Sequence, residues 1–182
     1  MTRSIDDAGS DTPHLVLVGL MGAGKTTVGY QCAKRLSRPF VDTDDLVQTA
    51  AGMTVAELFA LSGEGRFRAM EREAVGDACA SPVPAVVACG GGAVLHADNR
   101  RQLKRSGFVV WLQAPPEVLA VRVGRGADRA ERPLLAGGPV TTLERLAAAR
   151  ASAYEAVADA VVDTGDRSVP EVVDAVLEEY GS

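Results

Sequence analysis

Five short apolar runs along the chain predict buried strands, at 14–18, 40–41, 85–89, 108–112 and 160–164. Between these runs the apolar residues recur with the period of a helix. The predicted helices cover 27–36, 46–51, 54–62, 64–80, 96–106, 117–123, 141–158 and 169–180. Strands that alternate with helices indicate an α/β fold, in which a parallel sheet is covered by helices on both faces.

Two segments carry no core pattern. Residues 1–12 are polar and acidic, which predicts a disordered N-terminal tail. The charged, glycine-bounded segment at 124–139, GRGADRAERPLLAGGP, interrupts the helical period and predicts a short mobile lid. The remainder predicts a single domain over 13–182, and no apolar run approaches the ~18 residues of a membrane span.

Composition and charge narrow the possible partners. The chain has 182 residues, 47% of them hydrophobic, and a formal net charge of −5. This acidic balance argues against nucleic acid or an anionic membrane as a partner. Three cysteines without CxxC or metal-ligand spacing predict reduced, mostly buried thiols and a cytoplasmic location.

The segment GLMGAGKT at 19–26 fits the phosphate-loop pattern GxxxxGK[ST], and it lies between a predicted strand and a predicted helix. Its glycines allow a tight turn whose backbone N–H groups face phosphate oxygens at the positive end of the helix dipole. Lys25 adds a positive charge, and the Thr26 hydroxyl is a ligand for Mg²⁺. The loop therefore predicts binding of a nucleoside triphosphate.

Chemistry-bearing residues also follow two other predicted strands. Asp42, Asp44 and Asp45 come directly after the run at 40–41, where open α/β sheets bind ligands. An acidic cluster there is also typical of a helix cap or a solvated turn. Three glycines at 90–92 follow the run at 85–89, and they either let the backbone turn or present bare N–H groups to a substrate.

These motifs together resemble the shikimate kinase family. The resemblance rests on the phosphate loop, the DTD cluster at 42–44, the GExxFRxxE stretch at 63–71, the GGG turn, RPLL at 132–135 and a later arginine at 150. It implies a three-layer P-loop kinase fold with a five-stranded parallel sheet and a lid, acting as a monomer. It also implies transfer of the γ-phosphoryl group of ATP to the 3-hydroxyl of shikimate, with Mg²⁺ as the metal, in the pathway to chorismate and aromatic amino acids.

The resemblance assigns a role to individual residues of this sequence. The implied catalytic residues are Lys25, Asp44 and Arg132. The implied ATP-binding residues are Gly22, Ala23, Gly24, Lys25, Thr26, Thr27, Arg122, Arg132 and Arg167. The implied shikimate-binding residues are Asp44, Arg68, Gly90, Gly91, Gly92 and Arg150. Thr26 and Asp42 are implied ligands of Mg²⁺, the aspartate through water.

Some of these assignments leave alternatives open. Without the resemblance, Arg66 and Arg72 are as good a carboxylate clamp as Arg68. Asp44 either takes a proton or only orients the attacking oxygen. The loop that carries Arg167 differs in spacing by about one residue from the common pattern. Phe59 and Phe67 either wall the substrate pocket or belong to the core, and Glu71 either steadies Arg68 or forms a surface ion pair.

Three other functions compete with this hypothesis. A kinase of gluconate or of a cyclitol would share the ATP site and differ at the acceptor. Paired arginines favour an acceptor with a carboxylate over an uncharged cyclitol. A GTP-dependent switch needs an NKxD motif, which the chain lacks because Asn99 is its only asparagine and Arg100 follows it. A silent nucleotide-binding module would not need acceptor, metal and lid residues together.

Overall fold

The computed structural model describes residues 13–125 and 138–181. The predicted tail at 1–12 lies outside the described residues, and so does most of the predicted lid, including Arg132.

The described residues form a parallel sheet of five strands. The strands are β1 (His14–Val18), β2 (Phe40–Asp42), β3 (Val86–Ala88), β4 (Gly107–Gln113) and β5 (Ala160–Asp163), in the spatial order β2-β3-β1-β4-β5. The sheet confirms the predicted α/β class and all five predicted strands, whose ends shift by at most one residue. Because β1 lies at the centre, the segment that follows it starts between both halves of the sheet.

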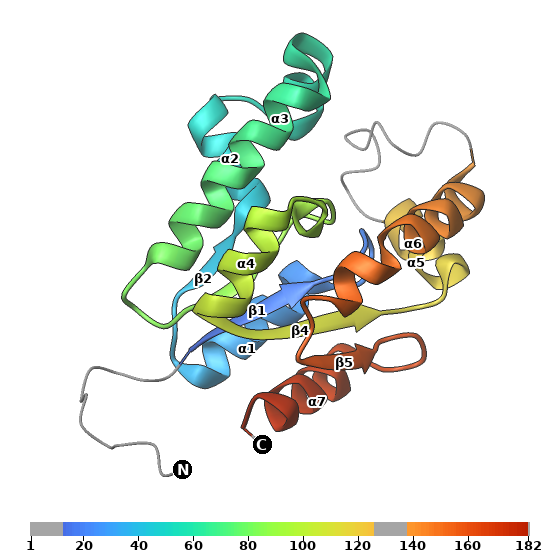
Figure 1. Cartoon of the computed structure of the whole chain (residues 1–182). Helices are drawn as coiled ribbons and strands as arrows, with labels where there is room; N and C mark the ends of the chain where they lie inside the picture. The colour runs from blue at the N-terminus through green and yellow to red at the C-terminus, as the bar shows by residue number, and fades with distance from the viewer. Residues whose placement is uncertain (1–12, 126–137, 182) are drawn as a thin grey trace.

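Helices cover both faces of the sheet. They are α1 (Lys25–Leu36), α2 (Thr43–Ala51), α3 (Val55–Ala80), α4 (Ala97–Ser106), α5 (Pro116–Arg125), α6 (Pro139–Glu155) and α7 (Val169–Gly181), with a 3₁₀ turn η1 (Ala93–Leu95) before α4. In Figure 1, α1 and α7 lie below the sheet and α4 and α6 lie above it, while α2 and the first part of α3 project away from the sheet. This arrangement gives the three layers that the sequence predicted.

The core follows from the apolar runs. Every residue of β1 is buried, and β3 is buried along its whole length. Strands covered on both faces read as continuous apolar runs, which explains why 14–18 and 85–89 show no alternation. A second, smaller cluster, with Val47, Leu58 and Phe67 at its centre, holds α2 against α3.

The long helix α3 is broken once, at Gly63. The backbone there has φ 73° and ψ 173°, outside the helical region, so the two predicted helices at 54–62 and 64–80 are confirmed as segments of one bent element. The first segment begins with the expected capping box, in which Thr54 and Glu57 each satisfy the other's backbone N–H group.

The cysteines and a histidine have structural positions. All three cysteines are free thiols; Cys32 and Cys89 are buried and Cys79 is half-buried, as predicted. His14 lies at the start of β1, and its Nδ1 accepts a hydrogen bond of 2.9 Å from the Ala85 backbone N–H.

Within residues 13–125 and 138–181, no single helix has the length and apolarity to span a membrane, and only α2 and α3 taken together, bent by 86°, meet that test.

Candidate active site

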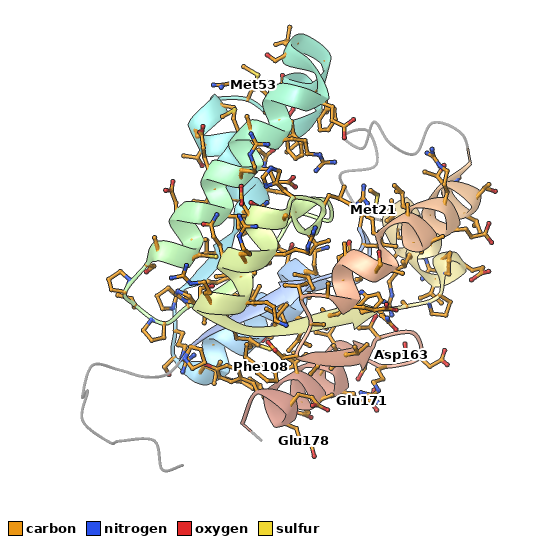
Figure 2. The ribbon with its side chains drawn as sticks, in the orientation of Figure 1. Met21, Met53, Phe108, Asp163, Glu171 and Glu178 are labelled. Carbon is orange, nitrogen blue, oxygen red and sulfur yellow. The ribbon has the colours of Figure 1, made fainter. Side chains whose placement is uncertain are left out.

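The candidate site lies at the carboxyl ends of the strands. Figure 2 places Met21 of the phosphate loop and Asp163 of β5 at the same end of the molecule, opposite Phe108 at the start of β4. A cavity of about 910 Å³ opens at this end. Its described lining includes the loop at 21–28, three arginines from three helices and part of the glycine turn after β3.

The phosphate loop passes directly from β1 into α1. Gly24 is the residue before the first helical turn and has φ 91°, a left-handed conformation that residues with a Cβ rarely adopt. The first backbone N–H groups of α1 therefore face the cavity without a side-chain cap. Lys25 Nζ donates a hydrogen bond of 3.0 Å to the Leu20 carbonyl, across the same loop. The loop thus has the geometry of an anion site.

Thr26 and Asp42 meet at the base of the loop. The Thr26 hydroxyl donates to Asp42 Oδ2 over 2.8 Å, although the two residues are 16 positions apart. Asp42 Oδ1 accepts from the Asp44 backbone N–H, so Asp42 also caps α2. Two hard oxygens held together beside a phosphate loop fit a Mg²⁺ ion that completes its shell with water and phosphate. Among the described residues, no three His, Cys, Asp or Glu side chains are grouped to hold a metal by themselves.

Asp44 lies in the first turn of α2 and lines the cavity. Burial, together with the neighbouring Asp42 carboxylate, raises the pKa of Asp44 from 3.8 to about 6, and the positive charge of Lys25 opposes this rise. Asp44 Oδ1 also lies against Gly90, where an added Cβ would be 2.6 Å away. A carboxylate with a pKa near 6 is ionised at neutral pH and basic enough to accept a proton.

Arg68 is held in place by two glutamates of its own helix. Its Nη1 donates to Glu71 Oε2 over 2.7 Å, and its Nε and Nη2 face Glu64 Oε1 at 3.3 and 3.2 Å. Glu71 is buried, and burial raises its pKa while the Arg68 charge opposes the rise. The contact supports the interpretation that Glu71 steadies Arg68, and Glu71 itself lines the cavity.

Glu71 also leaves one oxygen unused. Its Oε1 is buried and has no hydrogen-bond partner among the described residues. This oxygen lies near Gly90, at 2.9 Å from the position of an added Cβ. A buried acceptor without a donor, at the wall of a cavity, fits a ligand hydroxyl or a water.

Arg150 contacts the glycine turn from a different helix, α6. It is buried on α6, and its Nη1 donates to the Gly91 carbonyl over 2.8 Å. Arg68 reaches the same turn, because an added Cβ on Gly92 would lie 2.0 Å from Arg68 Nη1. Two guanidinium groups from different helices thus converge on one turn, which is the arrangement that grips a carboxylate.

The remaining predicted residues line the other end of the cavity. Arg122 donates through Nη1 to the Thr164 hydroxyl over 2.9 Å, and through Nη2 to the carbonyls of Thr164 and Gly165. Arg167 also lines the cavity, next to Val169. No sequence pattern marks Thr164 or Val169, because they reach the cavity through the packing of segments that are distant in the sequence, as in the contact of Thr164 with Arg122.

The structure brings nearly all predicted site residues together. Those that line the cavity are Gly22, Ala23, Gly24, Lys25, Thr26, Thr27, Asp42, Asp44, Arg68, Gly91, Gly92, Arg122, Arg150 and Arg167. Gly90 is not among the described lining residues; its N–H donates to the Thr43 hydroxyl over 2.9 Å, behind Asp44. Arg132 lies outside the described residues.

The residues that line this cavity decide between alternatives that the sequence left open for the arginines and the phenylalanines of α3. Arg68 is among its described lining residues, whereas Arg66 and Arg72 are not. Phe59 and Phe67 line the cavity and also pack together, with ring centroids 4.7 Å apart. Phe67 also belongs to the smaller core cluster, and Phe59 packs against that cluster.

The fold and the site define a P-loop phosphotransferase, a kinase with a small-molecule acceptor site beside its phosphate loop. A family described as "Shikimate kinase" matches residues 21–180. The chain therefore belongs to the shikimate kinase family.

Individual relatives agree with this membership. A shikimate kinase from Symbiobacterium thermophilum is 51% identical over 166 residues, covering 91% of this chain and 94% of the relative. The structure of a shikimate kinase from Acinetobacter baumannii in complex with shikimate is 35% identical, with a TM-score of 0.87 over 92% of each chain. A gluconokinase from Sinorhizobium meliloti, 23% identical with a TM-score of 0.59 over 93% of this chain and 92% of its own, shares the fold alone.

Proposed function

We propose that this chain transfers the γ-phosphoryl group of ATP to the 3-hydroxyl of shikimate, giving shikimate 3-phosphate and ADP. The observation that carries the proposal is the convergence of Arg68 and Arg150 on the turn at Gly91 and Gly92, in the same cavity as the phosphate loop. Two guanidinium groups select an acceptor with a carboxylate, which separates shikimate from uncharged sugars and cyclitols.

The nucleotide would bind along the loop. Its β- and γ-phosphates would accept hydrogen bonds from the uncapped N–H groups of α1, and Lys25 would exchange the Leu20 carbonyl for a phosphate oxygen. Arg122 and Arg167 border the far end of the cavity, where a guanidinium can stack on the adenine ring. Phosphoryl transfer then depends on holding the two reactants in line and on neutralising charge.

Asp44 is suited to handle the acceptor proton. It lies close enough to Lys25 for the two charges to interact, so a hydroxyl beside Asp44 also lies near the phosphates. Above its pKa of about 6, Asp44 is an acceptor that orients the 3-hydroxyl and takes its proton as the new P–O bond forms. ADP leaves with the electron pair of the broken bond.

Thr26 and Asp42 would hold Mg²⁺, the aspartate through water, because their oxygens already lie within 2.8 Å of each other. When bound, the ion supplies positive charge against the phosphate oxygens. By resemblance, Arg132 of the RPLL stretch would add a further positive charge against the phosphates. We also propose a monomer that acts in the cytoplasm.

Shikimate methyl ester tests directly whether Arg68 and Arg150 bind the carboxylate of the acceptor. The ester keeps the 3-hydroxyl and the ring but removes the charge, so kcat/KM should fall about 100-fold or more relative to shikimate, because charge-assisted contacts are lost. In Arg68→Ala or Arg150→Ala the difference between acid and ester should shrink. An ester that reacts as well as the acid in the wild type would contradict the proposed acceptor site.

A further inference from the structure

Tyr154 lies beside Arg150, one of the two arginines proposed to bind the acceptor carboxylate, and no role has been assigned to it so far. It lies one helical turn after Arg150 on α6, so both side chains project from the same face of the helix. Tyr154 is 1% exposed and does not appear among the described residues that line the cavity. Any effect on the reaction must therefore pass through its neighbours.

One backbone carbonyl joins the two residues. The Gly91 carbonyl accepts a hydrogen bond from the Tyr154 hydroxyl over 2.7 Å and a second from Arg150 Nη1 over 2.8 Å. A carbonyl oxygen has two lone pairs, so both are occupied. The tyrosine fixes the direction in which the glycine turn presents this oxygen, and the oxygen fixes one nitrogen of the guanidinium.

The tyrosine ring is itself fixed to the sheet. It stacks on Trp111 of β4 with ring centroids 5.2 Å apart and an angle of 22° between the planes. Trp111 is paired in the sheet with both β1 and β5. Burial raises the pKa of Tyr154 to about 12, so its hydroxyl remains a donor throughout the working pH range. This connects the rigid centre of the sheet to the glycine turn.

We propose that Tyr154 is a positioning residue for the acceptor site, which holds the Gly91 carbonyl and thereby the Arg150 guanidinium in the orientation that binds the shikimate carboxylate. This inference rests on the proposed function. Without the Tyr154 hydroxyl, the Gly91 carbonyl would keep its hydrogen bond from Arg150 but lose the second one. The glycine turn and the Arg150 guanidinium would then both have more conformational freedom before shikimate binds. Binding of the acceptor would then include the cost of ordering them.

Tyr154→Phe removes the hydroxyl and keeps the ring stack. We expect the KM for shikimate to rise about 3- to 10-fold, the effect of one net hydrogen bond, while kcat and the KM for ATP stay within about twofold. The KM does not depend on the concentration of active enzyme, so this split can be measured even if part of the variant unfolds.

Tyr180→Phe is the matched control. Its hydroxyl also donates to a backbone carbonyl, that of Pro13, and its ring also packs on an aromatic side chain, Phe108. Phe108 lies at the opposite end of the sheet from the site (Figure 2). We expect this variant to keep both KM values.

A second background tests the route through Arg150. In Arg150→Ala, adding Tyr154→Phe should change the KM for shikimate by less than twofold, because the group it positions is gone. An unchanged KM in Tyr154→Phe, an equal rise for ATP, or the full effect in the Arg150→Ala background would overturn the inference while leaving the reaction in place. A wild-type protein that does not use shikimate would instead overturn the proposed function.

Discussion

Replacing Asp44 by asparagine should lower activity strongly and stabilise the fold. The substitution keeps the size of the side chain and removes a charge that the protein holds at a cost, since burial and Asp42 raise the pKa of Asp44 from 3.8 to about 6. At 1.36 kcal/mol for each tenfold change in proton affinity, this difference corresponds to about 3 kcal/mol. Because the cavity is open to water, we expect a gain of about 1–2 kcal/mol in the free energy of unfolding at pH 8.

The sign of the pH dependence follows from the raised pKa. The folded protein binds the Asp44 proton more tightly than the unfolded chain, so the penalty for ionising this group is absent below about pH 3.8 and fully present above about pH 6. The advantage of Asp44→Asn should therefore be largest at pH 8 and disappear as the pH falls towards 4. In thermal unfolding, the gain corresponds to about 2–8 °C in Tm at pH 8.

The assay is thermal unfolding at several pH values, followed by the fluorescence of Trp111, the only tryptophan. Asp45→Asn is the matched control; it removes a charge one residue along the same helix, at an exposed position, and should change Tm by less than Asp44→Asn does. In kinetics, Asp44→Asn should lower kcat at least about 100-fold. The reasoning is refuted if Asp44→Asn is less stable than the wild type at pH 8, or if its gain is the same at pH 4 and pH 8.

Three further outcomes are expected. Arg68→Ala should raise the KM for shikimate about 10- to 100-fold, because a charge-assisted contact with the carboxylate is lost. Arg66 is exposed, and Arg66→Ala should leave this KM unchanged; equal effects of the two variants in initial-rate assays would count against the role of Arg68. Gly92→Ala places a Cβ 2.0 Å from Arg68 Nη1 and should raise the KM for shikimate at least about tenfold. Gly65→Ala, whose added Cβ has nothing within 4 Å, should not change it. A wild-type KM in Gly92→Ala would show that the guanidinium moves aside freely. The pH profile of kcat/KM should fall below a midpoint of about 6, as Asp44 becomes protonated, and a flat profile down to pH 5 would exclude an ionised Asp44 as the essential group.

The sequence was sufficient for the features that depend on local pattern. The strands at 14–18 and 108–112 are continuous apolar runs because helices cover both faces of the sheet, and the phosphate loop requires only neighbouring residues. The break at Gly63 was also visible, since a glycine between two helical patterns marks a change of backbone direction.

The features that the sequence could not supply depend on contacts between distant elements. The pairing of Thr26 with Asp42 joins residues on two elements, and the choice of Arg68 over Arg66 depends on how α3 rotates toward the cavity. The Gly91 carbonyl accepts hydrogen bonds from Arg150 and Tyr154, which lie 59 and 63 positions further along the chain. No periodicity in the chain encodes such a contact.

Shikimate as the acceptor that the cavity pairs with ATP is tested most directly by ADP release from the purified protein. With ATP and Mg²⁺, the rate should be compared for shikimate, quinate, gluconate and no acceptor. The account predicts strong stimulation by shikimate and a rate near background for the other two. Stimulation by gluconate, with none by shikimate, would contradict shikimate as the acceptor, although gluconate also carries a carboxylate for Arg68 and Arg150 to bind.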